Sequence, residues 1–230
     1  MSNSTGNKHD ERPVVWFDID NTLYSASAKI SQAMGVRIHD YFVNLGLGHE
    51  EASELHHRYY TQYGLALRGL TRHHNVDPLD FDKKCDGSLP LEEMIKYDPK
   101  LRKLFEDIDR SKVRVWALTN AFKPHALRVL RILKLDDLAM SKAGITDPSK
   151  CYFVDDNRAN VEAAAKEGWG HCVHFCEKGL HTVEGGKVSQ IGNEPLSDAS
   201  PTVIDISHLE ELRKIWPEIF IQGEPEPNGV

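Results

Sequence analysis

The fold is decided by residues 14–22, which read Val-Val-Trp-Phe-Asp-Ile-Asp-Asn-Thr and run from four apolar residues directly into a pair of carboxylates. An apolar run that stops at a polar residue is typical of a parallel strand that is buried on both faces and presents polar side chains at its carboxyl end. Further candidate strands lie at residues 113–118, 152–154, 172–175 and 203–206. We therefore expect a parallel sheet.

Helical apolar spacing fills the intervals between the later strands, at residues 124–135, 160–167 and 208–216. Alternation of strands and helices predicts an α/β fold with a doubly wound parallel sheet. The core domain is expected to comprise residues 14–23 and 109–220.

The long interval between the first two strands, residues 24–108, carries no strand signal. Apolar residues recur there at helical spacing over residues 28–45, 50–63 and 90–108. This pattern predicts an α-helical insertion after the first strand, which we call the cap.

Three segments have the composition of loops or disordered chain. Residues 177–202 are punctuated by Gly, Asn and Pro and are expected to form a hairpin or a loop. The polar segments 1–13 and 221–230 are expected to be disordered.

The composition of the chain is that of an ordinary soluble protein, with 230 residues, 40% hydrophobic and 27% charged. The net charge of −7 is spread along the chain without a basic stretch, which argues against a nucleic acid polymer or a membrane as partner and favours a small-molecule substrate. No run of about 18 apolar residues is present. Four cysteines without a disulfide framework indicate a reducing compartment, for which we expect the cytoplasm, with the nucleus as the alternative.

Polar side chains follow the predicted strands at the edge where ligands bind. In a doubly wound sheet the crevice lies beyond the carboxyl ends of the strands, so Asp18, Asp20, Thr119, Asp155 and Asp156 should converge there. Phosphoryl transfer requires a nucleophile, a proton donor for the leaving oxygen, and positive charge over the phosphoryl oxygens. The predicted crevice offers a candidate for each requirement.

Asp18 and Asp20 both face the crevice if the chain turns there, one as nucleophile and the other as general acid and base. Asp155 and Asp156 add the oxygen ligands that Mg²⁺ prefers, and the metal offsets the repulsion between carboxylates and phosphate. The hydroxyl of Thr119 is suited to donate to a phosphoryl oxygen. Any one of these residues alone would more simply be a helix cap or a turn former, but their joint placement favours the site.

Three motifs resemble those of the haloacid dehalogenase-like (HAD-like) hydrolase superfamily, whose core is a HAD-like Rossmannoid sheet. The first corresponds to residues 18–22 (Asp-Ile-Asp-Asn-Thr), the second to residues 118–120 (Leu-Thr-Asn) and the fourth to residues 154–157 (Val-Asp-Asp-Asn). The acidic Asp20 is typical of the phosphatases of this superfamily rather than of its dehalogenases, which need no leaving-group acid.

Within the superfamily the chain is most similar to the fungal-type pyrimidine 5'-nucleotidases, through residues 59–70, 86–90 and 119–121. The resemblance implies an aspartyl-phosphate enzyme that cleaves nucleoside 5'-monophosphates. Asp18 would attack phosphorus and Asp20 would protonate the leaving nucleoside. Mg²⁺ would be held by Asp18, the Asp20 carbonyl and Asp155, with Asp156 beside them.

The third motif of the family, a lysine that neutralises the nucleophile and the phosphate, has no counterpart in this sequence. Only 36 positions separate Thr119 from Asp155. A complete strand–helix–strand crossover takes about 30 residues, and the family fold needs two here. We therefore predict that one edge βα unit is missing, with a join near residues 138–139 that resembles an internal deletion.

The remaining candidates for binding phosphate are Thr119, Asn120 and Lys123, of which Lys123 is placed to replace the missing lysine in part. Arg158 is a weaker substitute, and Lys142 is expected on the wrong side of the sheet. In the cap, Arg68 lies between glycines and is a candidate to contact the base or phosphate, the alternative being a salt bridge within the cap.

The sequence thus supports three hypotheses. The first is a Mg²⁺-dependent 5'-nucleotidase that prefers pyrimidine nucleotides. The second is a catalytically impaired isoform that binds phosphate or nucleotide without the third-motif lysine. The third is a poorly folded isoform without function. The oligomeric state does not follow from the sequence.

Overall fold

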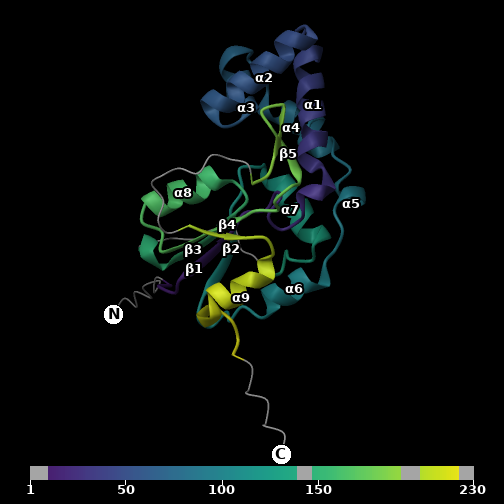
Figure 1. Ribbon diagram of the computed structural model, residues 1–230. Helices are drawn as coiled ribbons and strands as arrows, with labels where there is room; N and C mark the ends of the chain where they lie inside the picture. Colours follow the sequence, from purple (N-terminus) through teal and green to yellow (C-terminus); the bar gives the residue numbers. More distant parts are fainter. Residues whose placement is uncertain (1–9, 139–146, 193–202, 223–230) are drawn as a thin grey trace, which may run out of the picture.

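The computed structural model describes residues 10–138, 147–192 and 203–222, and its core is a five-stranded parallel sheet in the order β2-β1-β3-β4-β7 (Figure 1). The predicted α/β fold with a doubly wound parallel sheet is confirmed. Each strand coincides within one or two residues with a predicted apolar run. The strands are β1 (Val14–Phe17), β2 (Arg114–Ala117), β3 (Cys151–Asp155), β4 (His171–Phe175) and β7 (Ile204–Ile206).

The register of the sheet brings the carboxyl ends of the central strands level with one another. Phe17 at the end of β1 pairs with Ala117 of β2 on one side and with Val154 of β3 on the other. Residues that follow these three positions therefore leave the sheet at the same edge.

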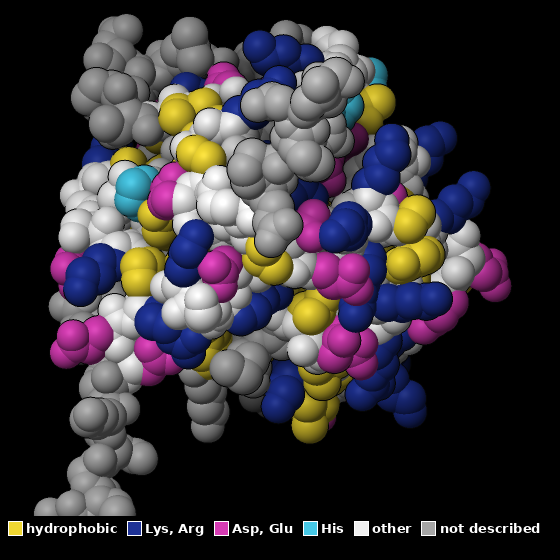
Figure 2. All heavy atoms as spheres, turned by 90° about the horizontal axis from the view of Figure 1, so that it is seen from below, with side chains coloured by type: hydrophobic (Ala, Val, Ile, Leu, Met, Phe, Trp, Pro, Cys, Tyr) yellow, Lys and Arg dark blue, Asp and Glu magenta, His cyan; other side chains and the backbone are white. Residues whose placement is uncertain are grey.

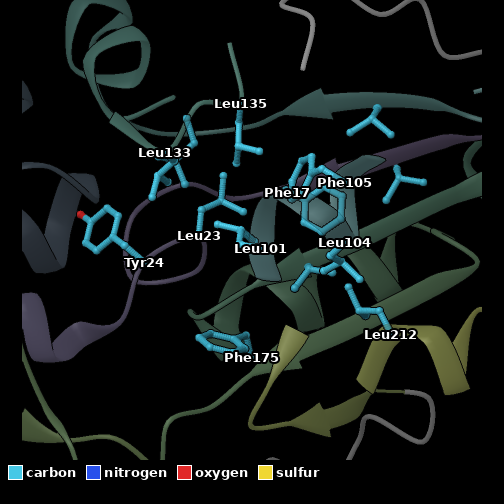
Figure 3. Packing of buried hydrophobic residues seen from close by; sticks show 14 of the residues in the cluster. Phe17, Leu23, Tyr24, Leu101, Leu104, Phe105, Leu133, Leu135, Phe175 and Leu212 are labelled. Atoms are coloured by element: carbon cyan, nitrogen blue, oxygen red, sulfur yellow. The ribbon is translucent and has the colours of Figure 1, made fainter. Parts of the chain in front are cut away.

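Both faces of the sheet are covered by helices, as the continuous apolar strands require. Val15 and Phe17 of β1 point into one apolar cluster, together with residues of α6 (Pro99–Glu106) and α7 (Lys123–Ile132). Figure 3 shows Phe17 beside Phe105 of α6, with 4.6 Å between the ring centroids.

The opposite face packs against α8 (Arg158–Lys166), with its apolar side chains centred on tryptophan. Trp16 lies between Trp116 and Trp169, with ring centroids 5.9 and 6.0 Å away. Val161 of α8 is fully buried in the same cluster. Alternate residues of β1 thus contribute to two separate layers of core.

The part of the cap up to residue 85 contains four α-helices and its own apolar cluster, at the top of Figure 1. Phe42, Tyr59 and Leu70 are buried in this cluster. The predictions over residues 28–45 and 50–63 are confirmed by the first two helices, whereas the two shorter ones were not predicted. The helices are α1 (Ile30–Asn44), α2 (His49–Tyr63), α3 (Ala66–His73) and α4 (Pro78–Lys84).

The helical spacing predicted over residues 90–108 is confirmed, but as two separate helices, α5 (Leu91–Met94) and α6. The break has a local cause: the side chain of Asp98 accepts a hydrogen bond from the Lys100 amide, and Pro99 occupies the first helical position, which together start a new helix. Residues of α5 and α6 pack in the same cluster as β1. The predicted cap boundary at residue 108 stays a prediction.

A β-hairpin is inserted between β4 and β7, so the first of the two alternatives predicted for residues 177–202, a hairpin or a loop, is the one observed among the described residues. It consists of β5 (His181–Glu184) and β6 (Lys187–Gln190), paired antiparallel. The turn is made by Gly185 and Gly186, both at positive φ (53° and 76°). The hairpin rises from the sheet towards the cap and runs beside α1 (Figure 1).

The remaining elements are short. Helix α9 (Leu212–Ile215) follows β7 and accounts for only part of the helix predicted over residues 208–216. Among the described residues no helix combines the length and apolarity that crossing a membrane requires. On the face seen in Figure 2, Lys and Arg side chains are interspersed with Asp and Glu. The 3₁₀ turns are η1 (Ala26–Ala28), η2 (Asp86–Ser88), η3 (Pro148–Lys150), η4 (Leu209–Glu211) and η5 (Pro217–Ile219).

Some predictions fall outside the described residues. These are the disorder predicted for residues 1–9 and 223–230, the position of Lys142, and the chain beyond the predicted join, residues 139–146. Within the described part of the chain, β2 pairs with β1 alone and forms one edge of the sheet. This arrangement is compatible with a missing edge βα unit, which stays a prediction.

Candidate active site at the carboxyl ends of the strands

Three carboxylates meet where β1 and β3 end. Asp18 follows β1, Asp155 is the last residue of β3 and Asp156 comes next. Among the described residues, they form the one group of His, Cys, Asp or Glu side chains able to hold a metal, with one oxygen of each lying within 4.8 Å of the others. The donor atoms are all carboxylate oxygens, the ligands that Mg²⁺ prefers.

The electrostatics of this group favour a cation. Burial raises the pKa of Asp18 well above its usual range, and the nearby charges of Asp155 and Asp156 raise it further. Burial likewise raises the pKa of Asp156, with the charge of Asp155 adding to the effect. Among the described residues, no lysine or arginine forms an ion pair with any of the three. The described residues therefore do not supply the positive charge that three ionised carboxylates need.

Asp155 is held in place by the turn that starts α8. Its Oδ1 accepts a hydrogen bond of 2.7 Å from the Asn157 amide, and its Oδ2 accepts one of 3.1 Å from Nδ2 of Asn160. The Asn157 side chain in turn caps α8 by accepting from the amides of Ala159 and Asn160. Sequence reasoning missed Asn160, although its position in the first turn after the fourth motif was a usable signal.

Asp20 occupies a different environment, two residues beyond Asp18. Its carboxylate lies outside the three-carboxylate group and is surrounded by hydrogen-bond donors. Oδ1 accepts a hydrogen bond of 2.7 Å from the Tyr24 hydroxyl and contacts Nε2 of His125 at 2.7 Å. Oδ2 lies 3.5 Å from the Thr119 hydroxyl. Burial opposes ionisation of Asp20, but the hydrogen bond and charge of His125, followed by the Tyr24 and Thr119 hydroxyls, outweigh it and lower its pKa.

His125 is the functional candidate that sequence reasoning missed. It lies in the first turn of α7 and is only 4% exposed. Its Nδ1 is 2.5 Å from Oδ1 of Asp86, a buried residue of η2, so the imidazole bridges two carboxylates. Burial lowers the pKa of His125, but the hydrogen bond with Asp20 and the adjacent carboxylate of Asp86 outweigh it and raise the pKa to about 10. The available signal was the position of His125 just after the second motif.

The structure gathers some of the predicted phosphate-binding residues at the site and leaves others at its margin. Thr119 accepts a hydrogen bond of 3.0 Å from the Ala121 amide, which aims its hydroxyl at Asp20. Asn120 is exposed in the same loop, and Lys123 is exposed in the first turn of α7. Both lie on the carboxyl side of the sheet.

The two predicted arginines are engaged elsewhere. Arg68 is exposed and donates from Nη1 to the Tyr63 carbonyl at 3.0 Å, a hydrogen bond within the cap. Arg158 pairs with Glu162 at 3.2 Å and with Asp205 at 3.0 Å. Neither is brought into the carboxylate group.

Comparison with known proteins places the chain in a family. Residues 13–168, which include both loops of the three-carboxylate group, match the model of the haloacid dehalogenase-like hydrolases. The chain belongs to this family. The superfamily resemblance of its motifs is thereby confirmed, whereas its assignment to the pyrimidine 5'-nucleotidase group stays a prediction.

The HAD-like hydrolase is 32% identical over 200 residues to phosphate metabolism protein 8 of Saccharomyces cerevisiae, in an alignment that covers 72% of this chain and 62% of the yeast protein. The chain thus spans less than two thirds of this relative. Because 200 aligned positions take up only 72% of a 230-residue chain, the yeast protein has residues within the aligned region that lack a counterpart here.

Solved structures show the same fold at low sequence identity. A predicted phosphoglycolate phosphatase from Haemophilus somnus 129pt superposes with a TM-score of 0.52 at 16% identity, covering 90% of this chain and 98% of the other. A dehalogenase superposes with a TM-score of 0.50 at 16% identity, covering 90% and 97%. These similarities establish the fold and leave the reaction to be argued from the site.

Proposed function

We propose that this HAD-like hydrolase is a Mg²⁺-dependent phosphatase that cleaves nucleoside 5'-monophosphates, with pyrimidine nucleotides preferred. The observation that carries the proposal is the contrast between Asp18 and Asp20, which lie two residues apart on one loop. Asp18 belongs to the three-carboxylate group, whereas hydrogen-bond donors surround Asp20. The two carboxyls therefore have different neighbours, one among candidate metal ligands and the other among hydroxyl and imidazole groups, which suits Asp18 to attack beside a metal and Asp20 to exchange protons.

The proposed reaction proceeds in two displacements. An oxygen of Asp18 bonds to phosphorus while the bond from phosphorus to the 5' oxygen breaks, and Asp20 gives the leaving oxygen a proton. Asp20 then takes a proton from water, whose oxygen bonds to phosphorus and releases inorganic phosphate from Asp18. The Thr119 hydroxyl is beside Asp20 and suited to orient a phosphoryl oxygen.

The carboxylates of Asp18, Asp155 and Asp156 fit Mg²⁺ by donor type and by spacing. When bound, Mg²⁺ supplies the positive charge that offsets repulsion between these carboxylates and a phosphate. The Asp20 carboxylate is turned towards its donors, so the Asp20 carbonyl is the part of this residue that we expect to act as a ligand. The hydrogen bonds from Asn157 and Asn160 keep Asp155 oriented for this role.

The proposed choice of a small substrate is supported by two residues, from the cap and from the hairpin, that interact electrostatically with Asp156. Burial raises the pKa of Tyr60 in α2, as do the charge of Glu184 in β5, a hydrogen bond with it, and the charge of Asp156. Glu184 also raises the pKa of Asp156. Tyr60, from the cap, and Glu184, from the hairpin, thus interact with each other and with the charge of Asp156, which makes them our candidates for selecting the ligand. Tyr60 also lies within residues 59–70, which resemble the nucleotidases.

A second candidate function is supported by the missing positive charge. Within the described residues the carboxylate group has no lysine or arginine partner, and the yeast relative contains aligned residues absent from this chain. We place the missing residues at the join near residues 138–139. In this alternative the protein binds nucleotide and Mg²⁺ but turns over very slowly, and Lys123 supplies only part of the missing charge.

One experiment separates these functions. Phosphate release is measured from a panel of nucleoside 5'-monophosphates with Mg²⁺, for the wild-type chain, for Asp18→Asn, and for a variant carrying the missing βα unit. Activity on UMP or CMP that Asp18→Asn abolishes supports the phosphatase. Thermal stabilisation by nucleotide without phosphate release, together with activity regained on insertion, supports the binding protein. Absence of a cooperative melting transition would show that the chain is poorly folded.

A further inference from the structure

A buried imidazole links the candidate acid and base to the cap. His125 comes from α7, Asp20 from the loop after β1, and Asp86 from η2 at the end of the cap helices. Nε2 lies 2.7 Å from Asp20 and Nδ1 lies 2.5 Å from Asp86. Both ring nitrogens therefore face a carboxylate, and the ring has no freedom to turn without losing both contacts.

We propose that His125 is a positioning residue for Asp20, and that Asp86 of the cap fixes the ring of His125 in turn. The inference rests on the proposed function, because it assigns Asp20 the proton transfer to the leaving oxygen. It adds a residue to that step which belongs to none of the three motifs identified in the sequence.

The two oxygens of Asp20 are not equivalent, and this asymmetry shows what the positioning achieves. Oδ1 receives the Tyr24 hydroxyl and His125, both at 2.7 Å. Among the described residues Oδ2 is contacted by the Thr119 hydroxyl alone, at 3.5 Å, which is longer than the usual range for an O–H···O hydrogen bond. His125 and Tyr24 together hold Oδ1, which leaves Oδ2 as the oxygen that exchanges a proton with the leaving group and with water.

The burial of this cluster makes the arrangement mutually dependent. His125 is 4% exposed and Asp86 is 8% exposed, so removing one partner leaves a charge in a site with little access to water. The positions of the cap and of Asp20 are thereby coupled through one side chain. A displacement of Asp86 with the cap frees the imidazole and, through it, the Asp20 carboxylate.

A purely structural role for His125 predicts a different outcome from a positioning role. If the contacts of His125 only join α7 to the segment before it, their removal should lower kcat/KM by the same factor for every substrate. If His125 positions Asp20, its removal should lower kcat/KM most for substrates whose leaving group needs a proton. The alkoxide of a nucleoside needs one, whereas 4-nitrophenolate leaves without it.

The test compares kcat/KM for a nucleoside 5'-monophosphate and for 4-nitrophenyl phosphate with Mg²⁺, because kcat/KM reports the steps up to the first irreversible one. We expect His125→Ala to lower kcat/KM by about 10²-fold for the nucleotide and by less than about 10-fold for the nitrophenyl ester, within the range for general acid catalysis. His125→Gln, which retains an N–H donor, should regain part of the loss. Asp86→Asn should show the same selectivity with a smaller loss.

The matched control is Arg128→Gln on the same helix. Arg128 joins α7 to the segment around η2 and α5 by pairing with Glu92 at 2.6 Å and donating to the Leu89 carbonyl at 3.0 Å, without touching Asp20. Its replacement should change kcat/KM by the same small factor for both substrates.

If the wild type is active and His125→Gln and Asp86→Asn each lower kcat/KM equally for both substrates, the inference is overturned while the proposed function stands. If His125→Ala does not fold, these two milder variants decide the question. A folded wild-type chain that releases phosphate from neither substrate overturns the proposed function, and the inference with it.

Discussion

Acid should destabilise this protein through one buried histidine of the cap. His56 in α2 is 4% exposed and stacks on Phe42, with ring centroids 6.1 Å apart. Burial, followed by the charges of His39 and His57, lowers its pKa from 6.5 to about 4. The unfolded chain therefore binds more protons than the folded one between these two pKa values. The contribution of His56 to the free energy of unfolding is fully present above the pKa of the unfolded state. It is lost as the pH is lowered towards the pKa of the folded state.

The magnitude follows from the size of the shift. Each unit of pKa difference corresponds to about 1.4 kcal/mol, so the shift of His56 is worth about 3 kcal/mol once the pH falls below both values. At pH 5 the loss should be about 2 kcal/mol. His56→Gln removes this titration, so its free energy of unfolding should decline less with acid than that of the wild type.

The assay is urea unfolding of wild type and His56→Gln at pH 7.5 and pH 5, with the difference between the two proteins compared across pH. Other groups titrate in this range, but they titrate in both proteins and cancel in the comparison. His181→Gln, an exposed histidine of β5, is the control for loss of a histidine, because it retains the buried imidazole. An equal pH dependence in wild type and His56→Gln would refute the argument.

Three other outcomes are expected. Mg²⁺ should raise the melting temperature in a thermal scan, and Asp155→Asn should reduce this rise. Without metal, Asp155→Asn should be at least as stable as the wild type, because it removes a carboxyl whose pKa is raised by burial. Phe105→Ala should cost about 3–5 kcal/mol in urea unfolding, because this ring is 1% exposed and packs on Phe17. Asn157→Ala should cost about 1 kcal/mol by the same method, because it removes the cap of α8; an unchanged stability would contradict that account.

The strands were predictable because parallel strands buried on both faces appear as short continuous apolar runs. Residues 14–17 and 151–155 fit this pattern, and the aspartates that follow them fit the position of a ligand crevice. Two strand ends thus supplied most of the candidate site. Their meeting at one edge of the sheet follows from the register of β1 and β3.

What the sequence did not reveal depends on tertiary contacts and on local capping. Apolar spacing over residues 90–108 does not show where one helix ends and the next begins, and the capping by Asp98 and Pro99 marks the start of α6. The role of His125 depends on Asp86, which is distant in sequence and reaches it only because the cap folds back over α7. Arg68 was chosen for its flanking glycines, which do not determine where its long side chain points.

The β5–β6 hairpin has a mechanical consequence for the cap. Its ends continue into the chain between β4 and β7, while Gln32 of α1 donates to the His181 carbonyl at 2.9 Å and the Val183 amide donates to Ser31 at 3.2 Å. At its tip, Gly186 lies so close to His56 that a Cβ would be 2.9 Å from Nδ1. The hairpin is therefore a third connection between the cap and the sheet, in addition to the two chain segments through which the cap continues into the core. A rotation of the cap must either move the hairpin together with α1 or break the contacts between them. The hairpin therefore restricts how far the cap can rotate relative to the sheet.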